Sequence, residues 1–254
     1  MKPIKVLVNA DDVIDALSKE GALTPAEIAD RVGIPRPSVY RLLDGLNAVG
    51  FTEALPNSKT QLSLRWLHLA DHARAGMREW TDARSVLADL VERTGQTAYL
   101  SVLRNNEAVC VEWEQGRGIG VLVLKPGRTL PLNAGAAGRT LLAFGADVEA
   151  YLERTSRKRF TKATLVGEDE LRADVVATRE RGYAVSDEDV TDGIGALGVP
   201  VGSPTVKAIG ALSLAGLAPD MTARREDFVD ELRRAANRLS PRPAADGEEP
   251  TTTG

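Results

Sequence analysis

Cysteine and long apolar runs are scarce in this sequence. Cys110 is the only cysteine among 254 residues, so neither an internal disulfide nor a site with paired thiolate ligands can form. Because Cys110 lies in an apolar stretch, we expect a buried core thiol. No apolar run approaches the roughly 20 residues that span a bilayer, and no signal peptide is evident. The sequence thus predicts a globular, cytoplasmic protein without membrane contact.

Patterns typical of enzymes and cofactor sites are also missing. His68 and His72 stand four residues apart, but no third metal ligand follows in the required arrangement. Residues 193–198 match the letters G-x-G-x-x-G, yet the apolar residues after them predict a strand where a dinucleotide site needs a helix. There is no Walker-type loop, Gly-x-Ser-x-Gly elbow or cysteine–histidine pair. We therefore expect no catalytic residues, no bound metal and no cofactor.

Basic charge is too sparse for a protein that coats nucleic acid, since the formal net charge is −4. Residues 1–75 hold nine Lys and Arg against nine Asp and Glu, and the remainder holds 23 against 27. The acidic surplus thus lies wholly outside the N-terminal part. If the protein meets DNA, we expect only the neutral N-terminal part to touch it.

The first 65 residues predict three short helices and a hairpin, in a chain long enough for two domains. The first helix is indicated by apolar residues at helical spacing, which are Leu7, Ala10, Ile14 and Leu17. Gly21 ends it. The second helix begins with a capping box, in which Thr24 and Glu27 cap each other's backbone amides around Pro25, and it ends at Gly33.

A third helix is predicted over residues 37–49, after a short turn. Its apolar face comprises Val39, Leu42, Leu43, Leu46 and Val49. The opposite face carries small and polar residues that leave room for a groove. Residues 51–55 and 60–64 then predict a hairpin around a turn at 56–59. These are the parts of a winged helix-turn-helix, whose third helix enters the DNA major groove, although an ordinary small helical bundle would share much of the pattern.

Several side chains of this segment are placed to contact DNA. Arg41 on the exposed face can reach a guanine edge or a phosphate, and Ser38 can bond a base or a phosphate. Arg36 and Tyr40 are better suited to contacts with the DNA backbone. Lys59 in the hairpin turn could reach the minor groove or a phosphate, but such a lysine is as often simply solvated. The candidate DNA-binding residues are Thr24, Arg36, Pro37, Ser38, Tyr40, Arg41 and Lys59.

The rest of the chain predicts an α+β domain. A winged helix-turn-helix over 1–65 and a linker helix over 66–78 precede a second domain over 79–240. Its predicted helices are 82–93, one starting at 133–138, 148–154, 168–182 and 222–239. Its predicted strands are 97–103, 108–113, 120–124, 183–186, 196–201 and 208–215. The tail, 241–254, is rich in Pro, Gly, Thr and acid, and we expect it to be disordered.

Four segments carry a resemblance to a known family. The stretch LTPAEIADRVGIPRPSVYRLLDGLNAVGF resembles the helix-turn-helix of IclR-family bacterial regulators. The resemblance continues in order through LPLNAGAAGRTLLAF, RERGYAVSDED with DGIGALGVPV, and AIGALSLAGL. It implies a GAF-like effector-binding domain, a homodimer or homotetramer, and a palindromic operator in double-stranded DNA. The expected function is a DNA-binding repressor controlled by a small molecule. The alternative is a small-molecule sensor or enzyme whose N-terminal helices mediate protein contacts.

The resemblance also implies where the effector binds. By analogy, the backbone amides of Ala136 and Ala137 face the ligand at a helix N-terminus, and Leu130, Leu132 and Asn133 line the approach. Members that bind small oxo-acids carry Asp, Cys and two serines on the facing strands, whereas the positions here are Ser186, Ala196, Ser213 and Ala215. The loss of polar groups predicts an effector less polar or larger than a small oxo-acid. Tyr99 and Trp113 could stack on it, although aromatics on strands are more often core.

Pro37 is a second departure from the family pattern. Many members have serine or another small polar residue at this position. Proline suits the first turn of a helix but cannot donate a backbone hydrogen bond. We therefore expect one phosphate contact of the family to be missing here.

Overall fold

The computed structural model describes residues 4–77, 80–118, 124–154, 156–202 and 210–240. Most of the predicted strand 120–124, the first two residues of the strand predicted at 208–215, and the predicted disordered tail 241–254 lie outside these ranges. The chain divides into two compact units, Met1–Arg78 and Glu79–Gly254. Within the described part, no helix is long and apolar enough to cross a membrane.

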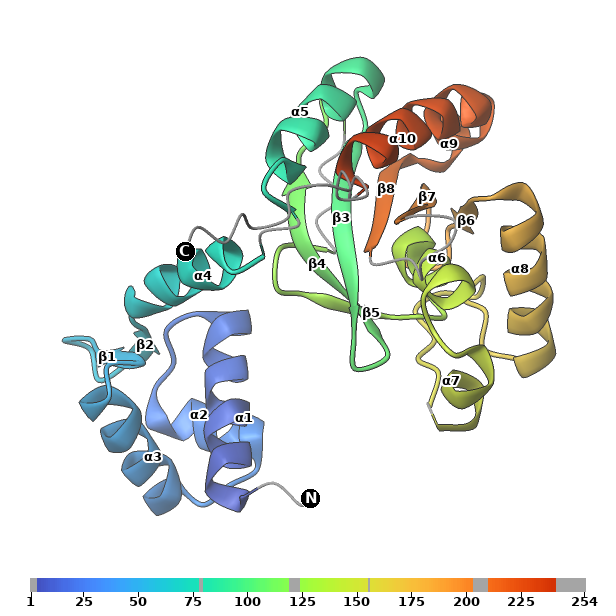
Figure 1. Ribbon diagram of the computed structural model, residues 1–254. Coiled ribbons are helices and arrows are strands. Elements are labelled where there is room, and N and C mark those ends of the chain that lie inside the picture. The colour runs from blue at the N-terminus through green and yellow to red at the C-terminus, as the bar shows by residue number, and fades with distance from the viewer. Residues whose placement is uncertain (1–3, 78–79, 119–123, 155, 203–209, 241–254) are drawn as a thin grey trace, which may run out of the picture. The chain divides into compact units, whose positions relative to one another are not determined.

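The N-terminal unit is a winged helix-turn-helix, as predicted (Figure 1). Its helices are α1 (Lys5–Glu20), α2 (Pro25–Val32), α3 (Arg36–Ala48) and α4 (Arg65–Ala75). Its strands are β1 (Thr52–Ala54) and β2 (Thr60–Leu62), which pair antiparallel. Its core is made by the buried residues Val13, Ala16, Leu17, Leu23, Ile28, Ala29, Val39, Leu43 and Leu46.

Two residues assigned to the inward faces of α1 and α3 are in fact exposed. Leu7 is 61% exposed because the core of this unit begins one turn later, at Ala10. Val49 is 52% exposed because it is the C-terminal cap of α3, where the backbone leaves helical geometry. The helix also begins one residue earlier than predicted, at Arg36.

In its described residues, the C-terminal unit forms a six-stranded antiparallel sheet with helices on both faces, which confirms the α+β prediction. The strand order is β5-β4-β3-β8-β7-β6. The strands are β3 (Thr97–Arg104), β4 (Glu107–Glu114), β5 (Thr129–Pro131), β6 (Ala184–Asp187), β7 (Ile194–Val201) and β8 (Gly210–Leu217). The helices are α5 (Ala83–Thr94), α6 (Gly135–Phe144), α7 (Val148–Arg154), α8 (Glu168–Arg181), α9 (Ala218–Ala223) and α10 (Arg225–Leu239). Helices α5 and α10 cover one face, and α6 with α7 and α8 lies on the other (Figure 1).

Two elements of this unit differ from expectation. Strand β5 is not predicted, because it is only three residues long and ends in Pro131. The single last helix predicted over 222–239 is instead two helices. The chain breaks at Arg224, whose φ of −112° and ψ of 27° are not helical.

Residues set aside as chemical motifs have structural roles. Residues 194–198 of the glycine-rich motif lie in strand β7, so no helix follows them to bind a dinucleotide. Cys110 is fully buried in strand β4, as predicted. Burial raises the pKa of its thiol to about 12. Among the described residues, no cluster of histidine, cysteine and acidic side chains could hold a metal ion.

Candidate DNA-binding and effector-binding sites

Helix α3 presents one face to the core and one to solvent. Val39, Leu43 and Leu46 are buried on one side, whereas Tyr40 on the other is 56% exposed. The solvent face comprises Arg36, Pro37, Tyr40, Arg41 and Asp44, with Ser38 half-buried beside it. Pro35 caps the helix without a side-chain hydrogen bond, and Pro37 lies in its first turn, where no amide is needed. The five contact residues predicted on α3 thus share one accessible helix surface.

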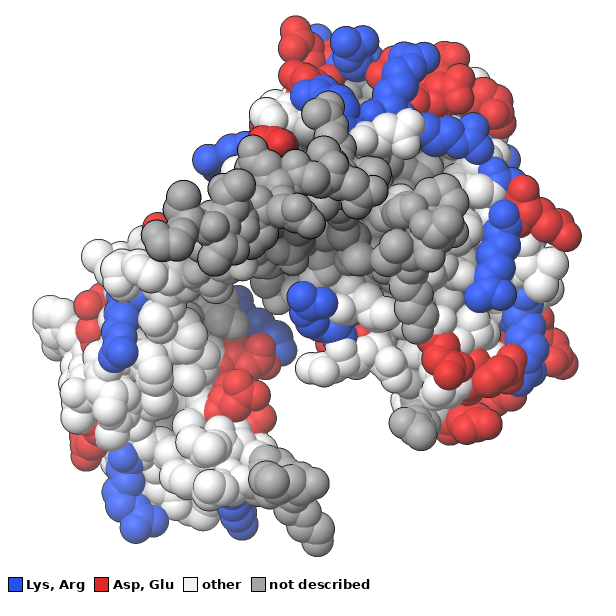
Figure 2. All heavy atoms as spheres, viewed as in Figure 1, with Lys and Arg blue, Asp and Glu red and all other residues white. Residues whose placement is uncertain are grey.

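The cations of this surface are free to meet a phosphate. Among the described residues, neither Arg36 nor Arg41 forms an ion pair or side-chain hydrogen bond. By contrast, Arg31 on α2 is bonded to Glu20 at 2.5 Å. On the visible face, blue and red side chains alternate along the outer helices of the C-terminal unit (Figure 2). Unpaired arginines on an exposed helix are the groups that bind phosphates and guanine edges.

Thr24 and Lys59 are placed differently from the residues of α3. The Thr24 hydroxyl accepts the Glu27 amide at 3.3 Å, and the Glu27 carboxylate accepts the Thr24 amide at 2.8 Å, which completes the predicted capping box. The Thr24 amide, and then the Thr24 hydroxyl, which donates to the same carboxylate at 2.9 Å, lower the pKa of Glu27, as does the nearby charge of Lys59. Lys59 is half-buried and closes the hairpin turn, whose exposed tip is residues 56–58.

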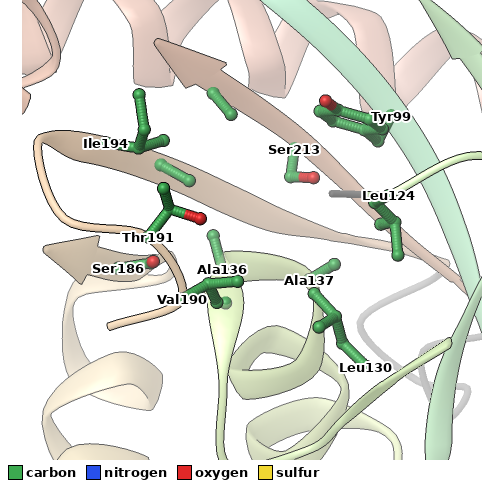
Figure 3. Close-up of a pocket in the computed structure, with 13 residues that line it drawn as sticks. Tyr99, Leu124, Leu130, Ala136, Ala137, Ser186, Val190, Thr191, Ile194 and Ser213 are labelled. Atoms are coloured by element: carbon green, nitrogen blue, oxygen red, sulfur yellow. The ribbon is translucent and has the colours of Figure 1, made fainter. Parts of the chain in front are cut away.

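The C-terminal unit encloses a cavity between the start of α6 and the facing strands (Figure 3). Its empty space, counted together with the part that is open to solvent, is about 490 Å³. The lining residues are Tyr99, Leu124, Leu130, Gly135, Ala136, Ala137, Ser186, Val190, Thr191, Ile194, Ala196, Ser213 and Ala215. None of them carries a charge, so the cavity suits a ligand with an apolar body.

Strand register explains where the space comes from. Ala196 pairs with Ala215 across β7 and β8, and Ser186 pairs with Ala196 across β6 and β7. This row of small side chains leaves a hollow beneath α6. Gly135 permits the entry of α6, because its φ of +72° disfavours any other residue and an added Cβ would lie 3.1 Å from Leu130.

The polar groups of the cavity lie at the start of α6 and, facing it, at two ends of the opposite wall. The amides of Ala136 and Ala137 occupy the first turn of α6, where no intrahelical acceptor exists. Ser213 faces them from β8 beside Tyr99, its cross-strand partner (Figure 3). Burial raises the pKa of the Tyr99 hydroxyl, so it remains a hydrogen-bond donor. At the other end lie Ser186 and Thr191.

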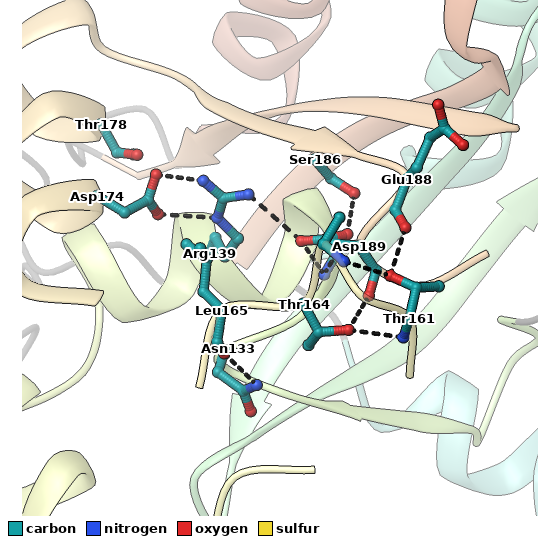
Figure 4. A network of polar contacts seen from close by, with 12 residues as sticks. Asn133, Arg139, Thr161, Thr164, Leu165, Asp174, Thr178, Ser186, Glu188 and Asp189 are labelled. Carbon is teal, nitrogen blue, oxygen red and sulfur yellow. Dashed lines mark hydrogen bonds and ion pairs between the residues drawn. The ribbon is translucent and has the colours of Figure 1, made fainter. Parts of the chain in front are cut away.

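A buried ion-pair network lies directly behind the Ser186 end (Figure 4). Asp189 is 1% exposed and accepts hydrogen bonds from the Ser186 hydroxyl and, at 3.3 Å, from the Gly135 amide. Arg139 on α6 pairs with Asp189 at 3.3 Å and with both oxygens of Asp174 on α8. Burial alone would lower the pKa of Arg139, but the hydrogen bond and charge of Asp174, and then Asp189, outweigh it and raise the pKa.

The structure brings together eight of the ten predicted effector residues. Asn133 does not line the cavity: its side-chain amide donates to the backbone oxygens of Lys158 and Leu165, and its amide oxygen accepts the Tyr151 hydroxyl at 3.0 Å. Trp113 stacks on Tyr99 with ring centroids 6.4 Å apart and lies outside the lining. The lining residues that sequence reasoning missed are Leu124, Gly135, Val190, Thr191 and Ile194. Three of these, Val190, Thr191 and Ile194, lie in the loop between β6 and β7 or at its end. The α6 and β8 residues that line the cavity with this loop are distant from it in sequence.

These features define a class of protein, a regulator with a DNA-binding winged helix-turn-helix and a ligand-binding domain. Comparison with known families agrees. The IclR helix-turn-helix domain matches residues 6–56, and the bacterial transcriptional regulator IclR C-terminal domain matches residues 76–241. The chain belongs to the IclR family of bacterial transcriptional regulators. It is a DNA-binding transcriptional regulator with a C-terminal effector-binding domain, in a family of regulators rather than enzymes.

Individual relatives cover nearly the whole chain. The HTH-type transcriptional regulator XynR of Escherichia coli K12 is 29% identical over 245 residues, covering 94% of this chain and 97% of the relative. BhcR of Paracoccus denitrificans is 30% identical over 243 residues, covering 93% of this chain and 86% of the relative. The crystal structure of an IclR homologue from Microbacterium hydrocarbonoxydans, complexed with 4-hydroxybenzoate, shares the fold. Its TM-score is 0.79 at 23% identity, over 92% of this chain and 97% of that one.

Proposed function

We propose that α3 of this regulator enters the major groove of a palindromic operator. The unpaired guanidinium of Arg41 on the exposed face is the observation that carries this assignment. Arg41 binds a guanine edge or a phosphate, and Ser38 binds a base or a phosphate beside it. Arg36 and Tyr40 contact the DNA backbone. Thr24 contributes as the cap that orients α2, since its hydroxyl is engaged within the protein.

A homodimer supplies the second recognition helix that a palindrome requires. Apolar side chains stand exposed on α1 and around α4, among them Leu7 at 61%, Leu64 at 75% and Leu67 at 65%. A soluble domain rarely leaves such residues together in water unless a partner covers them. A second copy of this chain, joined through α1 and α4, would set the two α3 helices about 34 Å apart. Two such dimers would form a tetramer.

The cavity of the C-terminal unit binds the effector. Its uncharged lining supports a ligand less polar than a small oxo-acid, because an apolar wall cannot replace the water around several ligand oxygens. A homologous fold binds 4-hydroxybenzoate, an acid with an aromatic body. The effector-free dimer holds the operator, and ligand binding changes the placement of the two DNA-binding heads, so the protein acts as a repressor.

The effector assignment is tested by filling the cavity. Ala215→Phe places a ring in the hollow between β8 and α6, far along the chain from the DNA-binding helices. Operator retention is measured by mobility shift for both proteins, with 4-hydroxybenzoate, hexanoate or glyoxylate added. We expect an apolar acid to release wild-type protein at concentrations where Ala215→Phe stays bound. Release by glyoxylate alone, or equal release of both proteins, would contradict the assignment.

A further inference from the structure

The two histidines of this chain lie side by side on helix α4. His68 and His72 stand four residues apart, so they occupy neighbouring positions on one side of the helix. Their ring centroids are 4.3 Å apart, and both residues are exposed. Two imidazoles at this distance can reach one small ion together, and imidazole is the commonest metal ligand among protein side chains.

A hydrogen bond to the helix backbone prepares the His72 ring for coordination. Its Nδ1 lies 3.0 Å from the carbonyl oxygen of His68. A carbonyl oxygen can only accept, so in the neutral ring Nδ1 carries the proton and Nε2 carries the lone pair. Metal-binding histidines are held in the same way, with the other ring N–H donated to a carbonyl or a carboxylate. The contact therefore fixes both the tautomer and the orientation of the ring.

The charged side chains near the pair permit a cation. Arg65 precedes His68 by three residues, but its guanidinium donates to the backbone oxygen of Val49 and lies 4.9 Å from the centre of the Phe51 ring. Its charge is thus engaged by the body of the N-terminal unit. Asp71 lies between the two histidines along α4 and adds a negative charge to this stretch of the helix.

One chain supplies only half of a metal site. Zinc is usually bound by four ligands in a tetrahedron. Among the described residues of one chain, no third histidine, cysteine or acidic side chain joins the pair. This is why the sequence by itself predicts no bound metal. A complete site needs two further ligands from another molecule.

A second copy of the chain can supply these ligands. The Trp66 indole packs on Phe51 and donates to its backbone oxygen at 2.8 Å, which marks the inward side of α4. Leu67, which follows Trp66 and precedes His68, is 65% exposed and belongs to the surface that we assign to the dimer contact. A two-fold contact presents the same residues from both copies, so it presents both histidine pairs at one interface.

We propose that the dimer binds one Zn²⁺ ion between its two α4 helices, through His68 and His72 of each copy. Four imidazole nitrogens supply the ligand number that zinc takes, and imidazole is a ligand type that it favours. The ion stabilises the dimer because it binds the dimer more tightly than the monomer. This inference rests on the α4 dimer contact proposed above.

The test measures zinc stoichiometry and mass in solution. Tag-free, full-length wild type, His68→Ala, His72→Ala and Asp71→Asn are freed of metal with EDTA, and zinc chloride is then titrated calorimetrically. Alanine is the best helix former, so the two histidine variants keep α4. Asp71→Asn is the matched control, because it changes a possible ligand on the same stretch of helix and leaves both imidazoles. Light scattering gives the mass of each protein with EDTA and with zinc.

We expect the wild type to bind half a zinc ion per chain. Either histidine variant should bind zinc at least tenfold more weakly, and Asp71→Asn should change binding less than threefold. Zinc should also keep the wild type dimeric at dilutions where the EDTA-treated protein dissociates. No zinc binding, one ion per chain, or equal losses in Asp71→Asn and the histidine variants would overturn the inference, and a dimer in EDTA would leave the α4 contact standing. A wild type that is monomeric with EDTA and with zinc alike would contradict the dimer contact itself.

Discussion

At the scale of single residues, Arg139 is the side chain whose loss the C-terminal unit should tolerate least. Its guanidinium forms ion pairs with both Asp174 and Asp189, and its side chain is only 9% exposed. Removing it leaves two buried carboxylates beside each other without a counter-charge. The same removal frees Asp189 from the position in which it holds Gly135 and Ser186. We therefore expect the cavity and the stability of its domain to depend on one buried guanidinium and its two ion pairs.

We therefore expect Arg139→Met to lower the free energy of unfolding by about 3 kcal/mol or more. Urea denaturation followed by circular dichroism measures this change. The control is Arg172→Met on α8, since Arg172 pairs with Glu149 and Asp169 at the surface and is 42% exposed. The control should unfold at nearly the same urea concentration as the wild type. Equal stability of both variants would show that the buried pair contributes little.

Cys110 offers a chemical test of core packing. Burial, and then the charge of Glu112, raises the pKa of its thiol to about 12, so almost no thiolate is present at pH 8. We expect native protein to resist a thiol reagent at pH 8 and at pH 9. Unfolded protein should react rapidly with one equivalent, and faster at the higher pH. Stoichiometric labelling of native protein within minutes would contradict the packing described for β4.

At the scale of elements, helix boundaries could be predicted from local chemistry. The capping box of Thr24 and Glu27 marks the start of α2, and the left-handed Gly33 marks its end. Helix α7 begins and ends where the sequence predicts. Strand β5 and the break at Arg224 could not be predicted, because a three-residue strand has no measurable period and the apolar pattern of α9 continues into α10.

The candidate site was only partly predictable for a related reason. Ala136, Ala137 and the strand positions facing them follow from the family resemblance. Asp189 does not, because in the sequence it is one acid in a charged loop, and its partner Arg139 lies 50 residues away. Nothing local indicates that this acid is buried. Val190 and Thr191 were missed with it, since the contact that brings the loop to α6 is tertiary.

The cap of α2 makes a measurable prediction for the DNA-binding unit. Thr24→Ala removes the side chain that accepts the Glu27 amide, and we expect it to cost about 1 kcal/mol of stability in the N-terminal unit. Thr24→Ser keeps the hydroxyl and should restore most of the loss. The measurement is the unfolding of the N-terminal helices, followed by hydrogen exchange of α2 amides. Identical exchange in all three proteins would show that the cap is dispensable.

At the scale of the whole molecule, the exposed apolar residues predict self-association. Leu67→Glu puts a charge on the surface that we assign to the dimer contact, and we expect the mass in solution to fall from a dimer or tetramer toward the monomer. Multi-angle light scattering measures this mass. Val176→Glu is the control, because Val176 on α8 is 54% exposed and lies outside the proposed contact. A wild-type protein that is already monomeric would contradict the dimer.

The most direct test of a DNA-binding regulator is a mobility-shift titration of the full chain against DNA from upstream of its own gene. An unrelated fragment serves as competitor, and the titration is repeated at low and moderate salt. The account predicts specific retention that weakens as salt rises, at least a tenfold loss for Arg41→Ala, and less than a threefold loss for Arg31→Ala, whose guanidinium already pairs with Glu20. No preference over the competitor at either salt concentration, or equal losses in the two variants, would contradict it.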